Sequence, residues 1–131
     1  MTPNQIYLIK KSFKLIKANS SNIGKNFYQL LFSTYPETKQ LFKNSIVEQE
    51  QKLMGMIAIA VANIDDLSPV VSAVKDLGKR HTMYGVKDEH YDMVGSVLLK
   101  AFRQELKKEF DTETEEAWKV LYNIIANTMK P

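Results

Sequence analysis

The sequence predicts an all-helical fold in one compact domain. Its 131 residues match the length of a single domain, and 44% of them are hydrophobic. The five glycines and four prolines fall between segments in which apolar residues recur at helical spacing, and no segment shows the alternation of a strand. We therefore expect about seven helices and no linker long enough to separate domains.

The first two helices are delimited by capping signals. Residues 2–5 read Thr-Pro-Asn-Gln, a capping box with proline at the first helical position, and the helix that they open runs to about Ala18. The polar residues 19–21 break this helix and supply the cap of a second one. The second helix carries an apolar stripe that includes Tyr28, and it ends at Pro36.

A short helix and a long one are expected next. Pro36 opens the short helix, which reaches Phe42, and we expect little or no helix between Phe42 and Ser45. Ser45 and Glu48 form a second capping box, which opens a long helix whose buried stripe reaches Ile64.

Three more helices complete the predicted fold. Residues 68–69, a Ser-Pro pair, start a helix that Gly85 ends, and Asp88 caps the helix after it. A third capping box at residues 112–115 opens the last helix, whose apolar stripe continues to Met129.

Composition excludes several classes of function. The chain has no cysteine, which excludes a disulfide scaffold, a thiol nucleophile, a zinc ribbon and a cysteine-held iron–sulfur cluster. Two histidines are too few for an all-protein transition-metal cage, although one histidine can hold a metal that arrives inside a cofactor. The net charge is only +3 and the lysines are scattered, so we expect no nucleic-acid partner. Without a long apolar run or a signal peptide, we expect no membrane partner and a cytoplasmic location.

Three polar residues, Tyr28, Gln49 and His81, lie on the apolar stripes of three different expected helices. Each has an ordinary explanation. The tyrosine hydroxyl can donate to a backbone carbonyl, the glutamine can lie in a solvated first turn of its helix, and the histidine can be a cation that the helix dipole favours near a helix end. Together they fit a haem pocket, in which a neutral imidazole binds the iron and polar groups on the other side hydrogen-bond its ligand. Candidate pocket walls are Phe42, Leu53, Ile57, Leu77, Val86, Val94 and Leu98, and candidate partners of the propionates are Lys52 and Arg80.

Three segments resemble bacterial single-domain globins of the flavohaemoglobin and Vitreoscilla-haemoglobin lineage. The matching residues are FYQLLFSTYPETKQLF at 27–42, VKDLGKRHTMYGVKDEHYDMVGSVLLKAF at 74–102 and AWKVLYNIIA at 117–126. The resemblance covers nearly the whole chain. It implies the globin fold, a three-over-three helical sandwich around a haem, with residues 1–131 as a single globin domain.

The resemblance also implies roles for individual residues. His81 would be the proximal ligand of the iron of one haem b per chain, and Phe42 would pack against that haem. Tyr28 and Gln49 would form the distal polar pair. The further roles are Leu53 as the distal apolar residue, Tyr91 as a proximal-side tyrosine, Tyr122 as a tyrosine that approaches the pocket from the last helix, and His90 as a structural or surface residue.

Two departures from the lineage bear on function. Its flavohaemoglobins carry a reductase after the globin, which this sequence lacks, so any catalytic turnover would require a separate reductase. They also hold a glutamate late in the last helix that hydrogen-bonds the proximal histidine and tyrosine. Counted onward from Tyr122, that position falls beyond Pro131, so we expect His81 to be nearer to an ordinary neutral ligand.

The function that we expect is oxygen binding for scavenging, storage or delivery. Two distal donors would hold the oxygen tightly. NO and CO are further small ligands of a haem. The alternatives are nitric oxide dioxygenation with a separate reductase, a gas-sensing haem domain, and a helical interaction domain without haem. We assign no catalytic residue beyond the distal pair of Tyr28 and Gln49, and the sequence leaves open whether the protein is an enzyme.

Overall fold

The computed structural model describes residues 1–43 and 45–131, and helices make up most of them. The α-helices are α1 (Pro3–Ala18), α2 (Ser20–Thr34), α3 (Ile46–Ala62), α4 (Val71–Met83), α5 (Asp88–Leu106) and α6 (Thr112–Met129). Short 3-10 helices lie between them: η1 (Pro36–Leu41), η2 (Ser68–Val70) and η3 (Lys107–Glu109). The described residues contain no strand, so the all-helical prediction is confirmed, with η1 as the short helix after α2.

The link between η1 and α3 was predicted to be short and without helix. Phe42, Lys43 and Ser45 are not helical, in agreement with that prediction. Asn44, which falls in the same link, lies outside the described residues.

The start of α1 follows the predicted capping box. The Gln5 N–H donates to the Thr2 hydroxyl at 3.1 Å, and the Thr2 N–H donates to the Gln5 side chain at 2.9 Å. The second predicted box does not form, because the Ser45 side chain makes no capping hydrogen bond to α3.

The caps of α4, α5 and α6 are shifted from their predicted positions. Residues 68–70 form η2, and α4 begins only at Val71. Lys87 precedes α5 in place of Asp88, and its N–H donates to Nδ1 of His90 at 2.9 Å, which gives His90 a structural role. Asp111 caps α6, because its carboxylate accepts from Thr114 N–H at 2.8 Å, and this bond lowers the pKa of Asp111.

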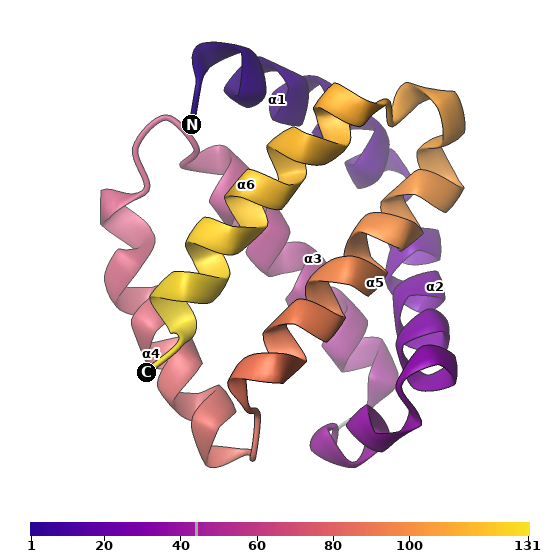
Figure 1. Cartoon of the computed structure of the whole chain (residues 1–131), viewed down its shortest axis with the longest axis vertical. Helices are drawn as coiled ribbons and strands as arrows, with labels where there is room; N and C mark the ends of the chain where they lie inside the picture. The colour runs from indigo at the N-terminus through magenta and orange to yellow at the C-terminus, as the bar shows by residue number, and fades with distance from the viewer. Residues whose placement is uncertain (44) are drawn as a thin grey trace.

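The helices pack in a crossed arrangement around one core. In Figure 1, α3 passes behind α5 and α6, and the chain's two ends lie on the α4 side of the molecule. Helix α6 packs on both α1 and α4, while α2 packs on both α3 and α5. The largest fully buried apolar side chains come from α1, α2 and α5, and they are Ile9, Ile16, Ile23, Phe27, Leu31 and Phe102.

A buried hydrogen bond joins the first and last helices. The indole Nε1–H of Trp118 in α6 donates to the hydroxyl of Ser12 in α1 at 2.8 Å, and both residues are buried. The Ser12 hydroxyl in turn donates to the Leu8 carbonyl at 2.7 Å. Because both polar groups are satisfied, the α1–α6 contact can be buried without an unpaired donor.

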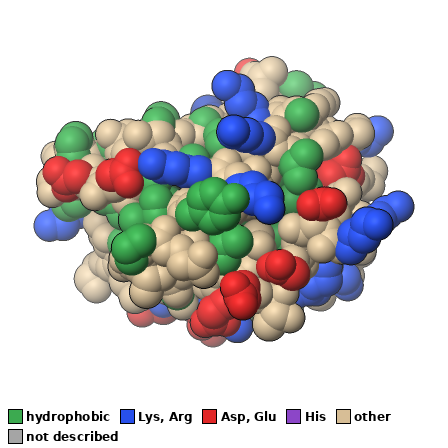
Figure 2. Space-filling model, turned by 90° about the horizontal axis from the view of Figure 1, so that it is seen from above, with side chains coloured by type: hydrophobic (Ala, Val, Ile, Leu, Met, Phe, Trp, Pro, Cys, Tyr) green, Lys and Arg blue, Asp and Glu red, His purple; other side chains and the backbone are tan. Residues whose placement is uncertain are grey.

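The outer surface mixes charges of both signs. The face in Figure 2 shows Lys and Arg side chains close to Asp and Glu side chains, with single apolar side chains between them. The densest lysine group, on α1, is exposed, and Lys10 Nζ pairs with the Asp65 carboxylate at 2.8 Å. Among the described residues, no helix is both long enough and apolar enough to cross a bilayer.

Helix α4 stands apart from the main core. It packs along α6 and makes little contact with α3 or α5. Leu77 and His81, on α4, are only half-buried and do not belong to the main hydrophobic cluster. The side of α4 that carries these two residues is therefore not packed by the main hydrophobic cluster.

Candidate functional site

Tyr28 supplies a buried hydroxyl next to the start of α3. Its side chain is 5% exposed, and the hydroxyl donates to the backbone carbonyl of Gln49 at 3.3 Å. Burial raises the pKa of Tyr28 well above its ordinary value, and the nearby Glu50 carboxylate raises it further. Tyr28 is therefore a neutral hydrogen-bond donor at any physiological pH.

Aromatic rings hold Tyr28 in place. Its ring centroid lies 4.8 Å from Phe27 and 5.3 Å from Phe42, both in edge-to-face geometry, and 5.9 Å from Phe32. Phe42 follows η1 and is half-buried. Phe42 was a predicted pocket residue, whereas Phe32 was predicted only as part of the apolar stripe that also carries Tyr28, four residues before it. The cluster fixes the position of the Tyr28 ring and hydroxyl oxygen, while the O–H bond can still rotate.

Helix α3 presents a stripe of predicted residues beside Tyr28. Gln49 and Leu53 are half-buried and Ile57 is buried, each one turn after the last. The backbone of Gln49, not its amide, is the partner of the Tyr28 hydroxyl. Lys52 is exposed, and the structure places it in no contact that marks a site.

His81 carries the imidazole on α4. Its Nδ1 lies 2.8 Å from the Leu77 carbonyl, so the tautomer that is protonated on Nδ1 donates this hydrogen bond and leaves Nε2 with a free lone pair. Burial lowers the pKa of His81, and the charge of the neighbouring Arg80 lowers it further. The structure therefore favours a neutral imidazole whose Nε2 can bind a metal. Arg80 itself is exposed.

A tight turn follows His81. The N–H of Val86 donates to the His81 carbonyl at 3.0 Å, and Gly85 has φ of 94°, a left-handed conformation that glycine adopts without strain. The predicted end of this helix at Gly85 is confirmed, with α4 ending at Met83. The turn leaves Val86 half-buried, and a Cβ at Gly85 would lie 3.8 Å from Leu41 of η1.

Tyr91 packs beside His81, and Tyr122 in turn contacts Tyr91. The Tyr91 ring stacks on the His81 ring, with centroids 6.5 Å apart and planes 23° apart. The Tyr122 hydroxyl donates to the Tyr91 carbonyl at 2.6 Å, and its ring lies against Gly95, where an added Cβ would be 2.6 Å from Tyr122 Cε2. Burial raises the pKa of both tyrosines. Tyr122 thus holds the backbone of Tyr91 through this hydrogen bond.

The donor set of this region suits a haem. One neutral imidazole has a free nitrogen, which fits a metal that carries its other ligands with it. The Tyr91 hydroxyl is buried and has no hydrogen-bond partner among the described residues, an orphan that a bound polar group could satisfy. The predicted wall residues are half-buried or buried, namely Phe42, Leu53, Ile57, Leu77, Val86, Val94 and Leu98. A planar apolar cofactor would cover the apolar side chains that remain partly exposed.

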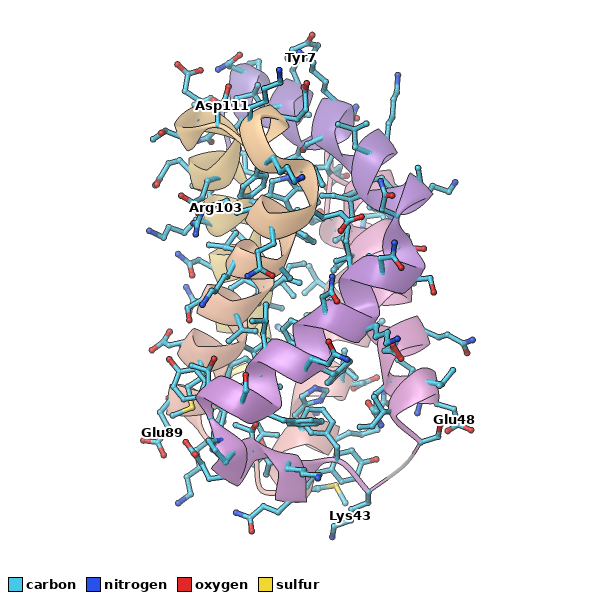
Figure 3. The ribbon with its side chains drawn as sticks, turned by 90° about the vertical axis from the view of Figure 1, so that its right-hand side faces the viewer. Tyr7, Lys43, Glu48, Glu89, Arg103 and Asp111 are labelled. Carbon is cyan, nitrogen blue, oxygen red and sulfur yellow. The ribbon has the colours of Figure 1, made fainter. Side chains whose placement is uncertain are left out.

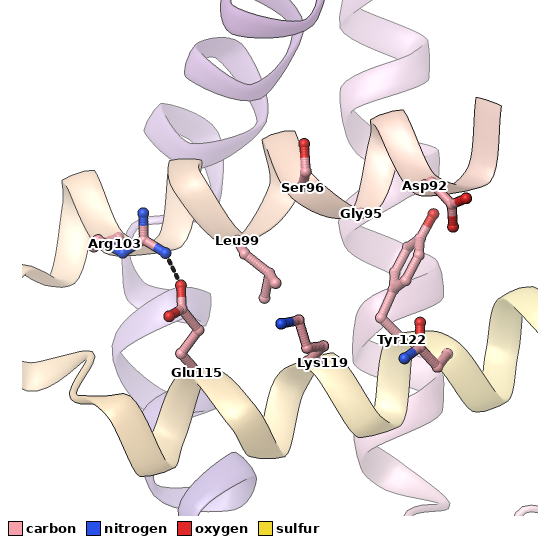
Figure 4. Close-up of a pocket in the computed structure, with 9 residues that line it drawn as sticks. Asp92, Gly95, Ser96, Leu99, Arg103, Glu115, Lys119 and Tyr122 are labelled. Atoms are coloured by element: carbon pink, nitrogen blue, oxygen red, sulfur yellow. Dashed lines mark ion pairs between the residues drawn. The ribbon is translucent and has the colours of Figure 1, made fainter. Parts of the chain in front are cut away.

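A hollow that was not predicted lies between α5 and α6. It has a volume of about 340 Å³, and Figure 4 shows it lined from both helices by Asp92, Ser96, Leu99, Lys119 and Tyr122, with an ion pair between Arg103 and Glu115 at one end. The charges around it cancel. In Figure 3, Arg103 lies at the α5 side of the molecule, far from the Lys43 end that adjoins Phe42.

Comparisons with known proteins give a consistent result. The family model described as Globin matches residues 25–129. A globin-like protein of Aquifex aeolicus whose function is uncharacterised is 33% identical over 98% of this chain and 91% of its own length. A flavohemoprotein of Vibrio cholerae is 32% identical over 96% of this chain, which spans only 33% of that protein.

Solved structures agree with the sequence comparisons. A bacterial globin from Campylobacter jejuni has a TM-score of 0.85 and 36% identity over 96% of this chain and 91% of its own. An engineered carbene transferase, made from a candidate nitric oxide dioxygenase of Rhodothermus marinus, has a TM-score of 0.91 and 26% identity over 99% of this chain and 91% of its own.

Proposed function

Because the chain belongs to the globin family, we propose that it is an oxygen-binding haem protein in which His81 is the iron ligand. The observation that carries this proposal is the hydrogen bond and the neutral form of the His81 ring. Its Nδ1 is tied to the Leu77 carbonyl, which leaves Nε2 as the free nitrogen of a neutral ring. We further propose haem b, one per chain, in a single globin domain of residues 1–131 located in the cytoplasm.

A bound haem would supply an iron centre for small diatomic ligands, chiefly O2 and also NO and CO. The residues of this chain would set how such a ligand is held. Tyr28 stays neutral and buried, so its hydroxyl can turn from the Gln49 carbonyl and donate to a ligand in the pocket. The Gln49 amide is the second proposed donor, and Leu53, one turn on, limits the space beside it.

The strength of these hydrogen bonds suggests a use for the protein. A hydrogen bond to a polarised ligand in a water-poor pocket contributes about 1–3 kcal/mol, and about 1.4 kcal/mol changes an affinity tenfold. Two donors therefore favour tight binding and slow release, which suits scavenging, or storage and delivery at low oxygen. The exposed Lys52 and Arg80 are proposed partners of the haem propionates at the pocket rim.

A second candidate function is nitric oxide dioxygenation. It is supported by the likeness to the Rhodothermus protein and to flavohemoproteins. The reaction combines NO with O2 and takes up one electron to give nitrate, so it requires a reductase that supplies this electron. Repeated turnover of NO in the presence of a reductase would favour this function, and a single stoichiometric event would favour oxygen binding.

Hemin titration of the purified protein tests the proposal. We expect a stoichiometric complex with a visible haem spectrum, strongly weakened in His81→Ala and unchanged in His90→Ala, the matched control at the chain's other histidine. A protein that takes up no hemin would refute the proposal.

The distal assignment is tested by oxygen dissociation. Tyr28→Phe and Gln49→Leu should each speed the release of O2 by roughly tenfold, since each removes one donor. Tyr35→Phe, which changes a tyrosine outside the proposed pocket residues, serves as the control. Unchanged release in both distal variants would show that these residues do not hold the ligand.

A further inference from the structure

The end of α6 meets α4 beside His81. A Cβ built on Gly78 would lie 2.7 Å from the Cα of Met129 and closer still to its carbonyl oxygen, so short a contact that α4 or the end of α6 would have to shift to admit it. Gly78 is buried, whereas Gly55 of α3 has open space around its Cα. The absence of a side chain at Gly78 is therefore what allows the backbones of the two helices to touch.

This contact adjoins the group that orients the imidazole. The carbonyl that accepts from His81 Nδ1 belongs to Leu77, in the peptide unit that joins Leu77 to Gly78. The next carbonyl, of Gly78, accepts from the Thr82 hydroxyl at 3.1 Å. A displacement of α4 at Gly78 would move the acceptor of the His81 hydrogen bond directly.

The next residue of the same segment reaches the ring that stacks on the imidazole. Lys130 Nζ lies 5.8 Å from the centre of the Tyr91 ring, within the range of a cation–π interaction. Tyr91 stacks on His81, and Tyr122 of α6 binds the Tyr91 carbonyl. The end of α6 thus contacts both the helix that carries His81 and the ring that packs against it.

We propose that the end of α6 is the positioning element of the proximal histidine, with Met129 docked on Gly78 to set the place of α4 and Lys130 on Tyr91 to hold the stacked ring. Gly78 and Lys130 are positioning residues, because neither bears on a ligand except through His81 and Tyr91. This proposal rests on the proposed function, in which His81 binds the haem iron.

The first test compares Gly78→Ala with Gly55→Ala in the haem-loaded protein. The Gly78 variant should shift or broaden the iron–histidine stretching band in the resonance Raman spectrum of the ferrous form, and it should lose haem about tenfold faster. The Gly55 variant makes the same change in a helix where the methyl group meets nothing, so both values should stay those of the wild type.

The second test does not depend on a tight contact. Lys130→Met keeps the aliphatic stem but removes the charge, and it should shift the same band and speed haem loss about threefold. Lys130→Arg should restore both values. Lys119→Met is the control, because it removes the same charge from a residue of α6 that lines the hollow between α5 and α6.

The outcomes separate the two proposals. If the wild type binds no hemin, or if His81→Ala binds it equally well, the proposed function fails. If hemin binds through His81 but Gly78→Ala or Lys130→Met keeps wild-type values, the positioning role alone is overturned. If Gly78→Ala does not fold, as judged by its helical circular dichroism, the Lys130 variants decide the question.

Discussion

Two neighbouring tyrosines differ in whether their hydroxyls are satisfied. The Tyr122 hydroxyl donates to the Tyr91 carbonyl at 2.6 Å, whereas the Tyr91 hydroxyl is buried without a partner among the described residues. A satisfied hydrogen bond contributes to stability, and an unsatisfied buried hydroxyl costs free energy. Removal of the hydroxyl should therefore lower the stability at Tyr122 but not at Tyr91.

Phenylalanine substitutions test this difference in the haem-free protein. Tyr122→Phe should lower the free energy of unfolding by about 1 kcal/mol, because its hydrogen bond to the Tyr91 carbonyl is lost. Tyr91→Phe should leave it unchanged or raise it, because an orphan hydroxyl is removed. Urea unfolding of both variants measures the effect, and a larger loss for Tyr91→Phe would mean that its hydroxyl has a partner in solution.

Alkaline pH gives a second test at the level of single residues. Burial holds the pKa of Tyr28 above its usual value of about 10, so the folded state keeps a proton that the unfolded state releases. The contribution of the protonated Tyr28 to the free energy of unfolding is complete below pH 10. It is lost as the pH rises from 10 toward the pKa of Tyr28 in the folded state. Between pH 10 and 12, Tyr28→Phe should lose stability less steeply than the control Tyr7→Phe, whose side chain is 59% exposed. Identical slopes would contradict the burial of Tyr28.

Among the helices, α1 and α6 offer a direct test of a buried hydrogen bond. Ser12→Ala leaves the Trp118 indole N–H without its acceptor, and this should lower the free energy of unfolding by about 1–3 kcal/mol. Ser33→Ala is the control, because the Ser33 hydroxyl donates only to Leu30 within its own exposed turn. Equal values for both variants would show that the indole finds another partner.

The helices themselves could be predicted from the sequence, but several of their caps could not. Apolar periodicity and the prolines located α1 to α6 because these signals are local. The cap of α6 depends on a competition between neighbouring acceptors. The Asp111 carboxylate accepts more strongly than the hydroxyl of Thr112, and Glu115, which the predicted box required, is engaged by Arg103.

Some residues of the candidate site could likewise be predicted from the sequence, and others could not. Tyr28 and His81 could be found from the sequence because each is a polar residue on an apolar stripe. Gly78 and Lys130 could not, because their contacts join α4 to the end of α6, far away in the sequence. The roles of all these residues stay predictions until the variants above are measured.

For the whole molecule, the packing of α4 predicts an uneven stability. Helix α4 packs along α6 and makes little contact with α3 or α5, and Leu77 and His81 are only half-buried. In the haem-free protein, amide hydrogens of α4 should therefore exchange faster than those of α5. Added hemin should slow exchange in α4 most, because it would bind His81. Equal protection of α4 and α5 before hemin is added would contradict this expectation.

The packing of α4 on α6 also constrains when a cofactor can be captured during synthesis. The ribosome produces α4 well before α6, so the helix that carries His81 leaves the ribosome without its main neighbour. The α1–α6 contact through Trp118 and Ser12 likewise waits for the last helix. A nascent chain that ends before residue 112 should bind hemin weakly, and stable capture should begin only once α6 has emerged.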